Sequence, residues 1–305
     1  MDFVPDRHGL VRRTELLDLG TSAAQITAMV RAAELLPVAP GIYAPADAVR
    51  DDGGRARELY RLRCLAAGAE HPAAVLSHQS AAAILGLDLL KPDVRRVHTI
   101  NGRHDGGTVH RSRHIHAAPF DDDVVVVDGV TLTGPARTAV DLAVAAHGFA
   151  QALTVFDSAL RAGVDRAELG RLLEVRRRRG IATARTALAR ADGRAASVGE
   201  SWSRAQMIEA RLPLPNLQTR FVTENGEVFT DFEWDRRLIG EFDGLLKYAR
   251  DLRPGETERD VVIREKLRED RLRDLGLVVI RWIWADLEHR RAIPRIRRAL
   301  DAVRR

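Results

Sequence analysis

The strongest constraint on the fold is an alternation of acidic and large apolar side chains in residues 230–244, TDFEWDRRLIGEFDG. A period of two is typical of a β-strand with one buried face. A three-residue loop at 235–237 pairs Trp234 with Leu238 and places the large aromatic side chains on one face. A two-residue loop would put Phe242 on the acidic face instead. The apolar pattern therefore predicts an antiparallel hairpin closed by the three-residue loop.

The other face of this hairpin carries four carboxylates, Asp231, Glu233, Glu241 and Asp243. In the same register Asp231 lies opposite Glu241, and directly opposed residues have Cβ atoms about 5 Å apart. Carboxylates that close repel each other unless a cation lies between them, and hard oxygen ligands favour Mg²⁺, Mn²⁺ or Ca²⁺. The spacing supports two interpretations equally: a divalent-metal site, and a solvated acidic strand in salt bridges with neighbouring arginines.

Lysine is rare in this chain, which has 48 basic residues but lysine only at positions 91, 247 and 266. Lysine is a compact charge whose pKa can be shifted, whereas arginine is a permanently charged fork. Lys247 is therefore a candidate to orient a water or to neutralise charge at a phosphoryl group. The alternative is a surface lysine paired with Asp251 at helical spacing. The catalytic residues predicted in this way are Asp231, Glu241, Asp243 and Lys247.

Residues 9–45 contain two short helical patterns, split by Gly20 and a Thr or Ser cap, and then the extended piece PVAPGIYAP. This order predicts a winged helix-turn-helix over residues 1–50, in which the second helix enters the major groove of DNA. The alternative is a three-element packing module. The residues predicted to contact DNA are Arg12 and Arg13 at phosphates, and Gln25, Thr27, Ala28 and Arg31 on the second helix.

A middle module over residues 55–192 has helical runs at its start, short strands in its centre and further helices after them, which predicts an α+β fold. Its strands carry histidines at positions 98, 104, 110, 114 and 116. No acid or cysteine completes a known metal-ligand spacing with them. We therefore expect a solvated strand face here rather than a metal site.

The third region, residues 197–305, begins with a capping box in which Ser197 and Glu200 satisfy the first turn of a helix. Three antiparallel strands follow, with the dipeptide at 225–226 as a turn signal. Thr257 then opens a helix that ends at Gly276, and LVVIRWIW is a buried strand. The whole chain is thus expected to be a multidomain protein of the α+β or α/β class.

Composition limits the classes of protein that this chain can belong to. It has 305 residues, 45% of them hydrophobic, and no run of eighteen apolar residues that would suggest a membrane span. Its single cysteine excludes an internal disulfide, and MDFVPDRHGLVRR lacks the apolar region of a signal peptide, so we expect a cytoplasmic protein. The net charge of +5 suits an anionic partner such as DNA.

The segments TDFEW, GEFDGLLKY and REKLREDRLRDLGLVVIRWIWADL resemble the PD-(D/E)XK nuclease-like domains of the very-short-patch-repair and DUF559 type, over about residues 197–290. The resemblance implies a restriction-endonuclease-like mixed sheet flanked by helices. It also implies that Asp231, Glu241 and Glu200 hold Mg²⁺ or Mn²⁺, with the carbonyl of Phe242 as a further ligand. Where that family has lysine two residues after the acid, this chain has Asp243. Either Lys247 substitutes for that lysine from a displaced position, or the site is inactive.

The front half is similar to actinobacterial proteins with an AbiEi-type antitoxin N-terminal domain. The segments that carry this resemblance are GLVRRTELLDLGTSAAQITAMVRAAELLPVAPGIYAP, SHQSAAAILGL and GPARTAVDLA. It implies a DNA-binding antitoxin or regulator that represses its own operon beside a toxin gene.

Three classes of function remain open at this stage. They are a DNA-binding protein whose nuclease-like domain hydrolyses phosphodiesters with a divalent metal, a non-catalytic antitoxin or repressor with a cognate toxin as partner, and a protein-binding scaffold. The sequence leaves the oligomeric state open.

Overall fold

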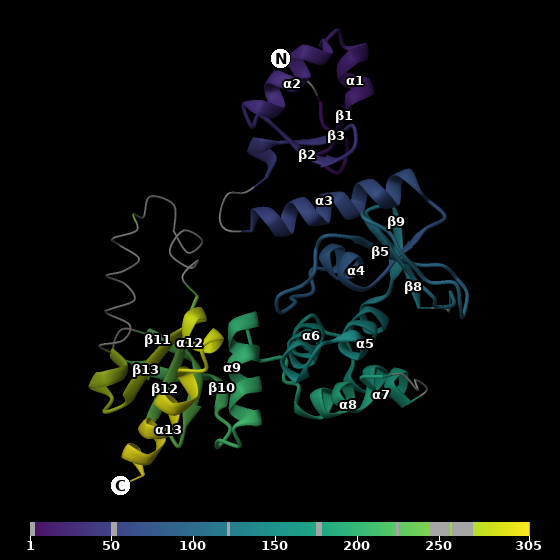
Figure 1. The fold of residues 1–305 in the computed structure, drawn as a ribbon. Helices are drawn as coiled ribbons and strands as arrows, with labels where there is room; N and C mark the ends of the chain where they lie inside the picture. Colours follow the sequence, from purple (N-terminus) through teal and green to yellow (C-terminus); the bar gives the residue numbers. More distant parts are fainter. Residues whose placement is uncertain are drawn as a thin grey trace. The chain divides into compact units, whose positions relative to one another are not determined.

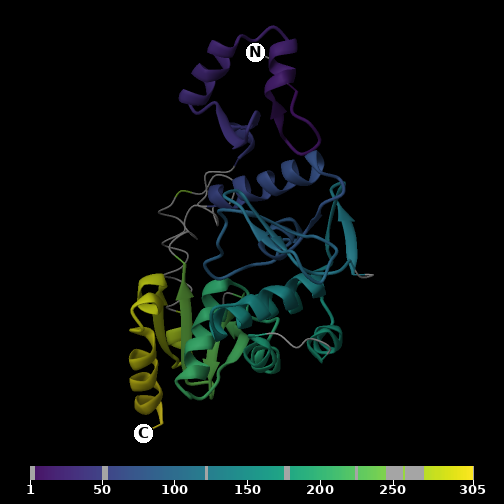
Figure 2. The same ribbon diagram turned by 45° about the vertical axis from the view of Figure 1, so that its right-hand side comes forward.

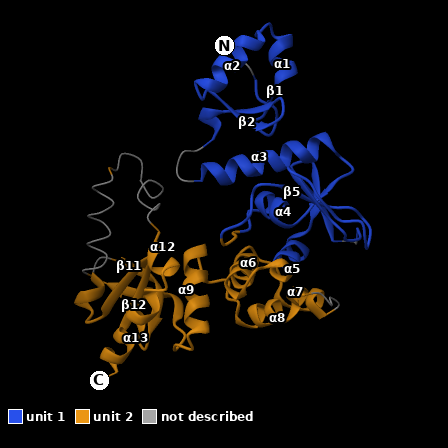
Figure 3. Ribbon diagram, in the orientation of Figure 1, with its two compact units in different colours: residues 1–87, 91–142 blue, residues 88–90, 143–305 orange. Residues whose placement is uncertain are grey.

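The computed structural model describes residues 4–49, 54–120, 123–174, 179–223, 226–244, 257 and 271–304. Within these ranges the chain is a mixed α+β protein with three separate sheets (Figure 1). It divides into two compact units, residues 1–87 with 91–142, and residues 88–90 with 143–305 (Figure 3). The finer division at 1–50, 55–192 and 197–305 stays a prediction. Every helix in the described residues is too short or too polar to cross a bilayer.

The N-terminal segment has the predicted order of helix, turn, helix and hairpin. Its elements are β1 (Val11–Arg12), α1 (Arg13–Asp18), α2 (Ala23–Arg31), β2 (Leu35–Ala39) and β3 (Ile42–Pro45), followed by the short helix η1 (Ala46–Ala48). The strands form a sheet in the order β1-β3-β2. Ser22 caps α2, because its hydroxyl accepts from the backbone N of Gln25 and the Gln25 side chain accepts from the backbone N of Ser22.

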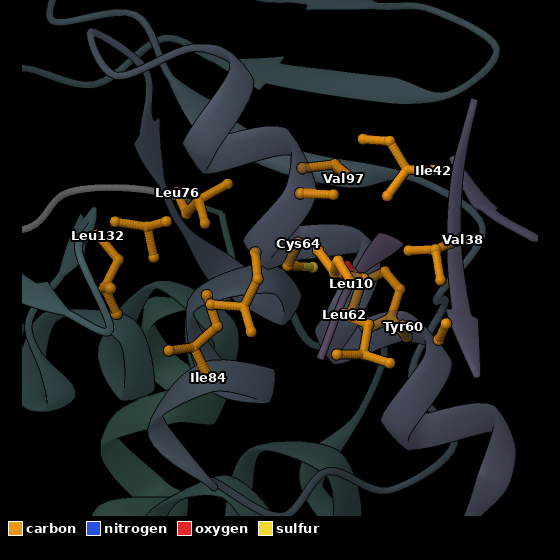
Figure 4. Packing of buried hydrophobic residues seen from close by; sticks show 14 of the residues in the cluster. Leu10, Val38, Ile42, Tyr60, Leu62, Cys64, Leu76, Ile84, Val97 and Leu132 are labelled. Atoms are coloured by element: carbon orange, nitrogen blue, oxygen red, sulfur yellow. The ribbon is translucent and has the colours of Figure 1, made fainter. Parts of the chain in front are cut away.

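A six-stranded sheet, in the order β6-β7-β5-β4-β9-β8, forms the rest of the first unit. Its elements are α3 (Arg55–Glu70), β4 (Val75–Leu76), α4 (His78–Leu85), β5 (Val97–Ile100), β6 (Thr108–Val109), β7 (Arg113–His116), β8 (Val124–Val127), β9 (Val130–Thr133) and the start of α5 (Pro135–Ala145). The pairs β5–β7 and β4–β9 are parallel. The helix α3 packs its buried Tyr60 and Cys64 among Val38, Leu76 and Leu132, which joins this sheet and the N-terminal hairpin in one core (Figure 4).

The second unit begins with helices and ends with a four-stranded sheet. The helices are α6 (Phe149–Arg161), α7 (Arg166–Glu174), α8 (Ile181–Arg190) and α9 (Val198–Glu209). A buried ion pair joins α6 to α9, since Arg204 donates to Asp157 at 2.8 Å and the Asp157 side chain is 0% exposed. The second carboxylate oxygen of Asp157 accepts from the backbone N of Asp192, just after α8. These contacts fix the helices relative to one another within the unit.

The C-terminal sheet has the order β10-β11-β12-β13, in which only the β12–β13 pair is parallel. Its elements are β10 (Asn216–Thr223), β11 (Gly226–Trp234), β12 (Leu238–Asp243), β13 (Val278–Ile283), α12 (Trp284–Glu288) and α13 (Ala292–Val303). Trp234 pairs with Leu238, as the three-residue loop predicts. The helix predicted from Thr257 lies largely outside the described residues.

The predicted aromatic face of this sheet is confirmed. Phe232, Trp234, Phe242 and Trp282 are buried in one core together with side chains of α9 and α13. Figures 1 and 2 show both helices lying against the sheet. The rings of Phe232 and Trp282 stack with their centroids 5.3 Å apart. This packing fixes the strands that carry the acidic residues.

Candidate functional site

Three carboxylates from three elements of the C-terminal region are buried. Glu200 lies in the first turn of α9, Asp231 on β11 and Glu241 on β12, with 2%, 7% and 5% of their surfaces exposed. Continued by one residue past Phe232, the hairpin register sets Asp231 opposite Glu241. The Asp231 carboxylate accepts a hydrogen bond from the backbone N of Phe242 at 2.8 Å, which fixes it against β12. These acids are therefore buried and not a solvated strand face.

Glu200 interacts with Asp231 and also caps its own helix. Burial, and next the negative charge of Asp231, raise the pKa of Glu200 above its usual range. Its oxygens accept from the backbone N of Ala196 and the hydroxyl of Ser197, both at 2.8 Å, and from the Gln218 amide at 3.1 Å. The predicted N-cap is present, since the Ser197 hydroxyl accepts from the backbone N of Glu200. The Glu200 side chain, however, reaches the backbone N of Ala196 and not that of Ser197, so the capping box is only half formed. Glu200 has a structural role that needs no metal, and its charge is nevertheless held beside a second buried acid.

Of the remaining predicted catalytic residues, Asp243 is less buried than these three acids. Asp243 is half-buried at the end of β12, where its register partner is Ile283. Lys247 lies outside the described residues. Glu233, the fourth acid of the hairpin, accepts from the Asn216 amide and from the backbone N of Arg236, so it stabilises the hairpin loop.

A metal site needs ligand atoms that lie close to one another. Among the described residues, one group of three potential metal ligands has its ligand atoms within 4.8 Å of one another. All three members of this group are histidines. Glu200, Asp231 and Glu241 are all described and do not form such a set. A Mg²⁺ or Mn²⁺ site at Asp231 and Glu241 therefore stays a prediction, based on two buried, opposed carboxylates.

Gly199 allows α9 to approach β12 closely enough to bring Glu200 beside the hairpin. A Cβ atom built at Gly199 would overlap the ring of Phe242. We expect Gly199→Ala to lower the free energy of unfolding by about 1–3 kcal/mol, because the close-packed core has no room for the added methyl group. All four tryptophans lie in the second unit, so tryptophan fluorescence during urea unfolding measures the effect.

Gly170 provides the matched control for that prediction. It lies inside α7, and a Cβ atom there would meet nothing within 4 Å. Gly170→Ala should raise stability by about 1 kcal/mol, because alanine has the higher helix propensity. If Gly199→Ala were as stable as the wild type, close approach of α9 to Phe242 would not be a requirement of the fold.

The residues predicted to contact DNA lie together at the N-terminal segment, but their side chains differ in availability. Arg12 is half-buried in ion pairs with Asp6 at 3.2 Å and Glu15 at 3.8 Å. The exposed Gln25 side chain accepts from the backbone N of Ser22, the N-cap of α2, and the Thr27 hydroxyl donates to the Ala23 carbonyl. The other three predicted residues, Arg13, Ala28 and Arg31, are exposed.

A histidine cluster in the six-stranded sheet is the feature that the sequence interpretation missed. His98 on β5 pairs in register with His114 on β7, and His116 follows two residues later on the same face. His98 Nδ1 lies 2.9 Å from His116 Nε2. The rings of His114 and His116 stack with centroids 3.8 Å apart. His78, the first residue of α4, stacks on His116 with centroids 3.7 Å apart.

The expected solvated strand face is wrong for these histidines. His78 and His98 are buried, each 7% exposed, and His114 and His116 are half-buried. Burial lowers the pKa of His98 to about 4 and also lowers the pKa of His78 and His114. These three rings are therefore neutral at pH 7. The spacing along the chain could not show this, because the cluster depends on the parallel pairing of β5 with β7 and on the position of α4.

The middle part of the chain is similar to a known family of domains. Residues 73–190 match the AbiEi antitoxin C-terminal domain. The match runs from just before β4 to the end of α8 and contains the whole histidine cluster. This part of the chain is therefore similar to that antitoxin domain. The segments SHQSAAAILGL and GPARTAVDLA, on which the resemblance was partly based, lie inside it.

Two curated relatives come from Mycobacterium tuberculosis. They are the uncharacterized protein MT2308 of strain CDC 1551 / Oshkosh and the uncharacterized protein Rv2248 of strain H37Rv. Each is 38% identical to this chain over 184 residues, which cover 58% of this chain and 65% of the relative. The chain thus spans just under two thirds of the length of these relatives.

Proposed function

We propose that this chain is a DNA-binding antitoxin of the AbiEi type, which represses its own promoter and pairs with a cognate toxin. The match of residues 73–190 to the antitoxin domain is the observation that carries the proposal. The N-terminal order of helix, turn, helix and two-stranded hairpin supports a winged helix-turn-helix as the module that binds DNA. A repressor binds DNA without cleaving it. This function therefore requires no catalytic role for the acidic residues of the second unit.

The exposed arginines of the N-terminal segment are the side chains most available to DNA. Arg31 lies in the last turn of α2, the helix that would enter the major groove, and Arg13 begins α1. Arg12 is already paired with two acids, so it offers less charge to a phosphate. Gln25 and Thr27 would have to exchange a hydrogen bond within the protein for one to a base. We therefore assign the largest single contribution on α2 to Arg31.

We expect Arg31→Ala to weaken binding to the chain's own upstream DNA by about 1–3 kcal/mol, the range for an arginine that contacts a base edge. Fluorescence anisotropy with the upstream duplex and a composition-matched random duplex measures it at fixed salt. Wild-type affinity should fall linearly on a log–log plot as salt increases, because phosphate contacts release counterions.

Arg297→Ala is the control for that measurement. Arg297 is an exposed arginine on α13, so its loss removes the same charge from a different element. It should leave the preference for the upstream duplex unchanged. Equal weakening by both substitutions, or equal binding of both duplexes by the wild type, would contradict sequence-specific reading by α2.

A second candidate function, metal-dependent hydrolysis of DNA, is favoured by the buried carboxylates of the C-terminal region. The mixed sheet with α9 against it is consistent with the restriction-endonuclease-like fold that the resemblance implies. Asp231 and Glu241 would hold Mg²⁺ or Mn²⁺, with the Phe242 carbonyl as a further ligand. The ion would polarise a phosphoryl oxygen of the substrate. A cation there would also favour the ionised form of Glu200, whose pKa is raised by burial.

A further inference from the structure

The histidine cluster of the first unit belongs neither to the predicted DNA-binding face nor to the acidic hairpin. It combines side chains from β5 and β7, with the ring of His78 packed over them from α4. One ligand nitrogen from each of His98, His114 and His116 lies within 4.8 Å of the other two. Three imidazole nitrogens gathered this closely can be reached by a single ion. Imidazole nitrogen is a ligand well suited to zinc, copper and nickel in proteins.

The spacing of one nitrogen pair is close to that of a tetrahedral site. Two imidazole ligands at 2.0–2.1 Å from Zn²⁺ are about 3.4 Å apart in tetrahedral geometry. His98 Nδ1 and His116 Nε2 are 2.9 Å apart, so a displacement of about half an ångström would suffice. A hydrogen bond between this pair needs one nitrogen to be protonated. A metal would replace that proton and take the lone pairs of both rings.

The surroundings hold the rings in place. The backbone N of His98 donates to Ser80 Oγ at 2.8 Å, and the Tyr60 hydroxyl hydrogen-bonds the same Ser80 oxygen at 2.9 Å. His78 has a backbone φ of 47°, in the left-handed region that a residue with a side chain rarely adopts. Such strained residues gather at functional sites, where the surrounding structure maintains them. These contacts hold β5 and α4 against each other.

The charged groups around the cluster shift the pKa values of its histidines in opposite directions. Arg96 lowers the pKa of His98 and His114, Arg137 lowers that of His78, and Asp93 raises that of His98. The two arginines disfavour any cation in the cluster, a proton as well as a metal. A metal bound here must offset that repulsion with coordinate bonds to several nitrogens, whereas a proton bonds to only one.

We propose that His98, His114 and His116 form a binding site for one first-row divalent transition metal ion of the zinc class. Three histidines leave the fourth tetrahedral position to water, as in zinc sites that keep an open coordination position. The site lies wholly in the first unit, inside the residues that match the antitoxin domain. Its ligands are nitrogens, so it is distinct in its chemistry from the oxygen-rich acidic hairpin. Binding should stabilise the first unit by mass action.

The test uses the full chain, free of any affinity tag and dialysed against a chelator. Zn²⁺ titrated against a chromophoric competitor should show one site per chain. Co²⁺ in its place should give the intense visible absorption of a four-coordinate ion. Zn²⁺ should raise the urea midpoint measured by circular dichroism and leave the tryptophan fluorescence midpoint unchanged, because the tryptophans lie in the second unit.

His114→Ala should lower the affinity for Zn²⁺ by more than the roughly 10- to 100-fold that the loss of an outer-shell partner costs. The matched control is His110→Ala, since His110 is exposed and lies outside the converging group. Glu241→Gln should leave Zn²⁺ binding unchanged, which separates this site from the acidic hairpin. Equal binding by His114→Ala and wild type would overturn the proposal. The weak spectrum of hydrated Co²⁺ with wild-type protein would also overturn it, and that measurement needs no variant to fold.

Discussion

Replacing Arg137 with methionine should lower the free energy of unfolding of the first unit by about 3–5 kcal/mol, the cost of breaking a buried ion pair from one side. Its side chain is 1% exposed and donates to Asp141 at 2.7 Å and to Asp123 at 2.9 Å. Methionine fills much of the same volume, but it leaves the buried Asp141 carboxylate without its guanidinium partner. Burial without that partner disfavours the ionised carboxylate. The circular dichroism midpoint in urea should therefore fall.

The exposed pair of Arg95 and Asp93 provides the control. These side chains form an equally short ion pair, 2.7 Å, but Arg95 is 77% exposed. Arg95→Met should leave both midpoints unchanged, because solvent screens surface pairs. Arg137→Met should lower the urea midpoint measured by circular dichroism and leave the midpoint measured by tryptophan fluorescence of the second unit unchanged. An unchanged circular dichroism midpoint for Arg137→Met would contradict the role assigned to this buried pair.

The hairpin was predictable from the sequence because a strand has a side-chain period of two. A shift by one residue would have moved Trp234 and Phe242 to the wrong face, so their pattern determined both the loop length and the pairing with Leu238. The same argument placed Asp231 opposite Glu241. It could not predict how deeply these acids are buried, because burial depends on the elements that cover the sheet.

The histidine cluster could not be predicted by the same reasoning. His114 and His116 share a face by strand periodicity, but His98 joins them only through the parallel pairing of β5 with β7. Parallel partners are connected through long segments, so local sequence does not specify them. His78 enters from the start of a helix. A search for acids or cysteines at fixed spacing therefore missed a group made by topology.

The burial of particular arginines also could not be predicted from the sequence. With 48 basic residues in the chain, no sequence feature marks Arg137 or Arg204 as different from the arginines at the surface. Arg137 and Asp141 are four residues apart on one helix, a spacing that usually indicates an exposed pair. Arg204 meets Asp157 across 47 residues of chain. Only the packing of the helices shows that these charges are buried and paired.

Substitutions in the acidic hairpin distinguish the two candidate functions experimentally. Under the second function we expect the full chain with Mn²⁺ to nick supercoiled plasmid, and Asp231→Asn to lower the rate by at least about 100-fold. Mutation of an outer-shell residue costs about 10- to 100-fold, and a direct ligand should cost more. Asparagine keeps the shape of Asp231 and an oxygen that can accept from the backbone N of Phe242. The substitution should therefore preserve the fold while removing the charge that holds the ion.

Glu233→Gln is the matched control, because Glu233 lies on the same strand and is equally buried, with its oxygens engaged by Asn216 and the Arg236 backbone. It should change the nicking rate little. Agarose gels of the wild type and both variants at equal concentration measure the effect. Equal loss in the two variants would show a general effect on the fold. Intact plasmid with a wild type that still binds its upstream DNA would exclude the second function. The buried acids would then have only structural roles, such as the hydrogen bonds of Glu200 to Ala196 and Ser197 at the start of α9, and repression would be the activity that remains.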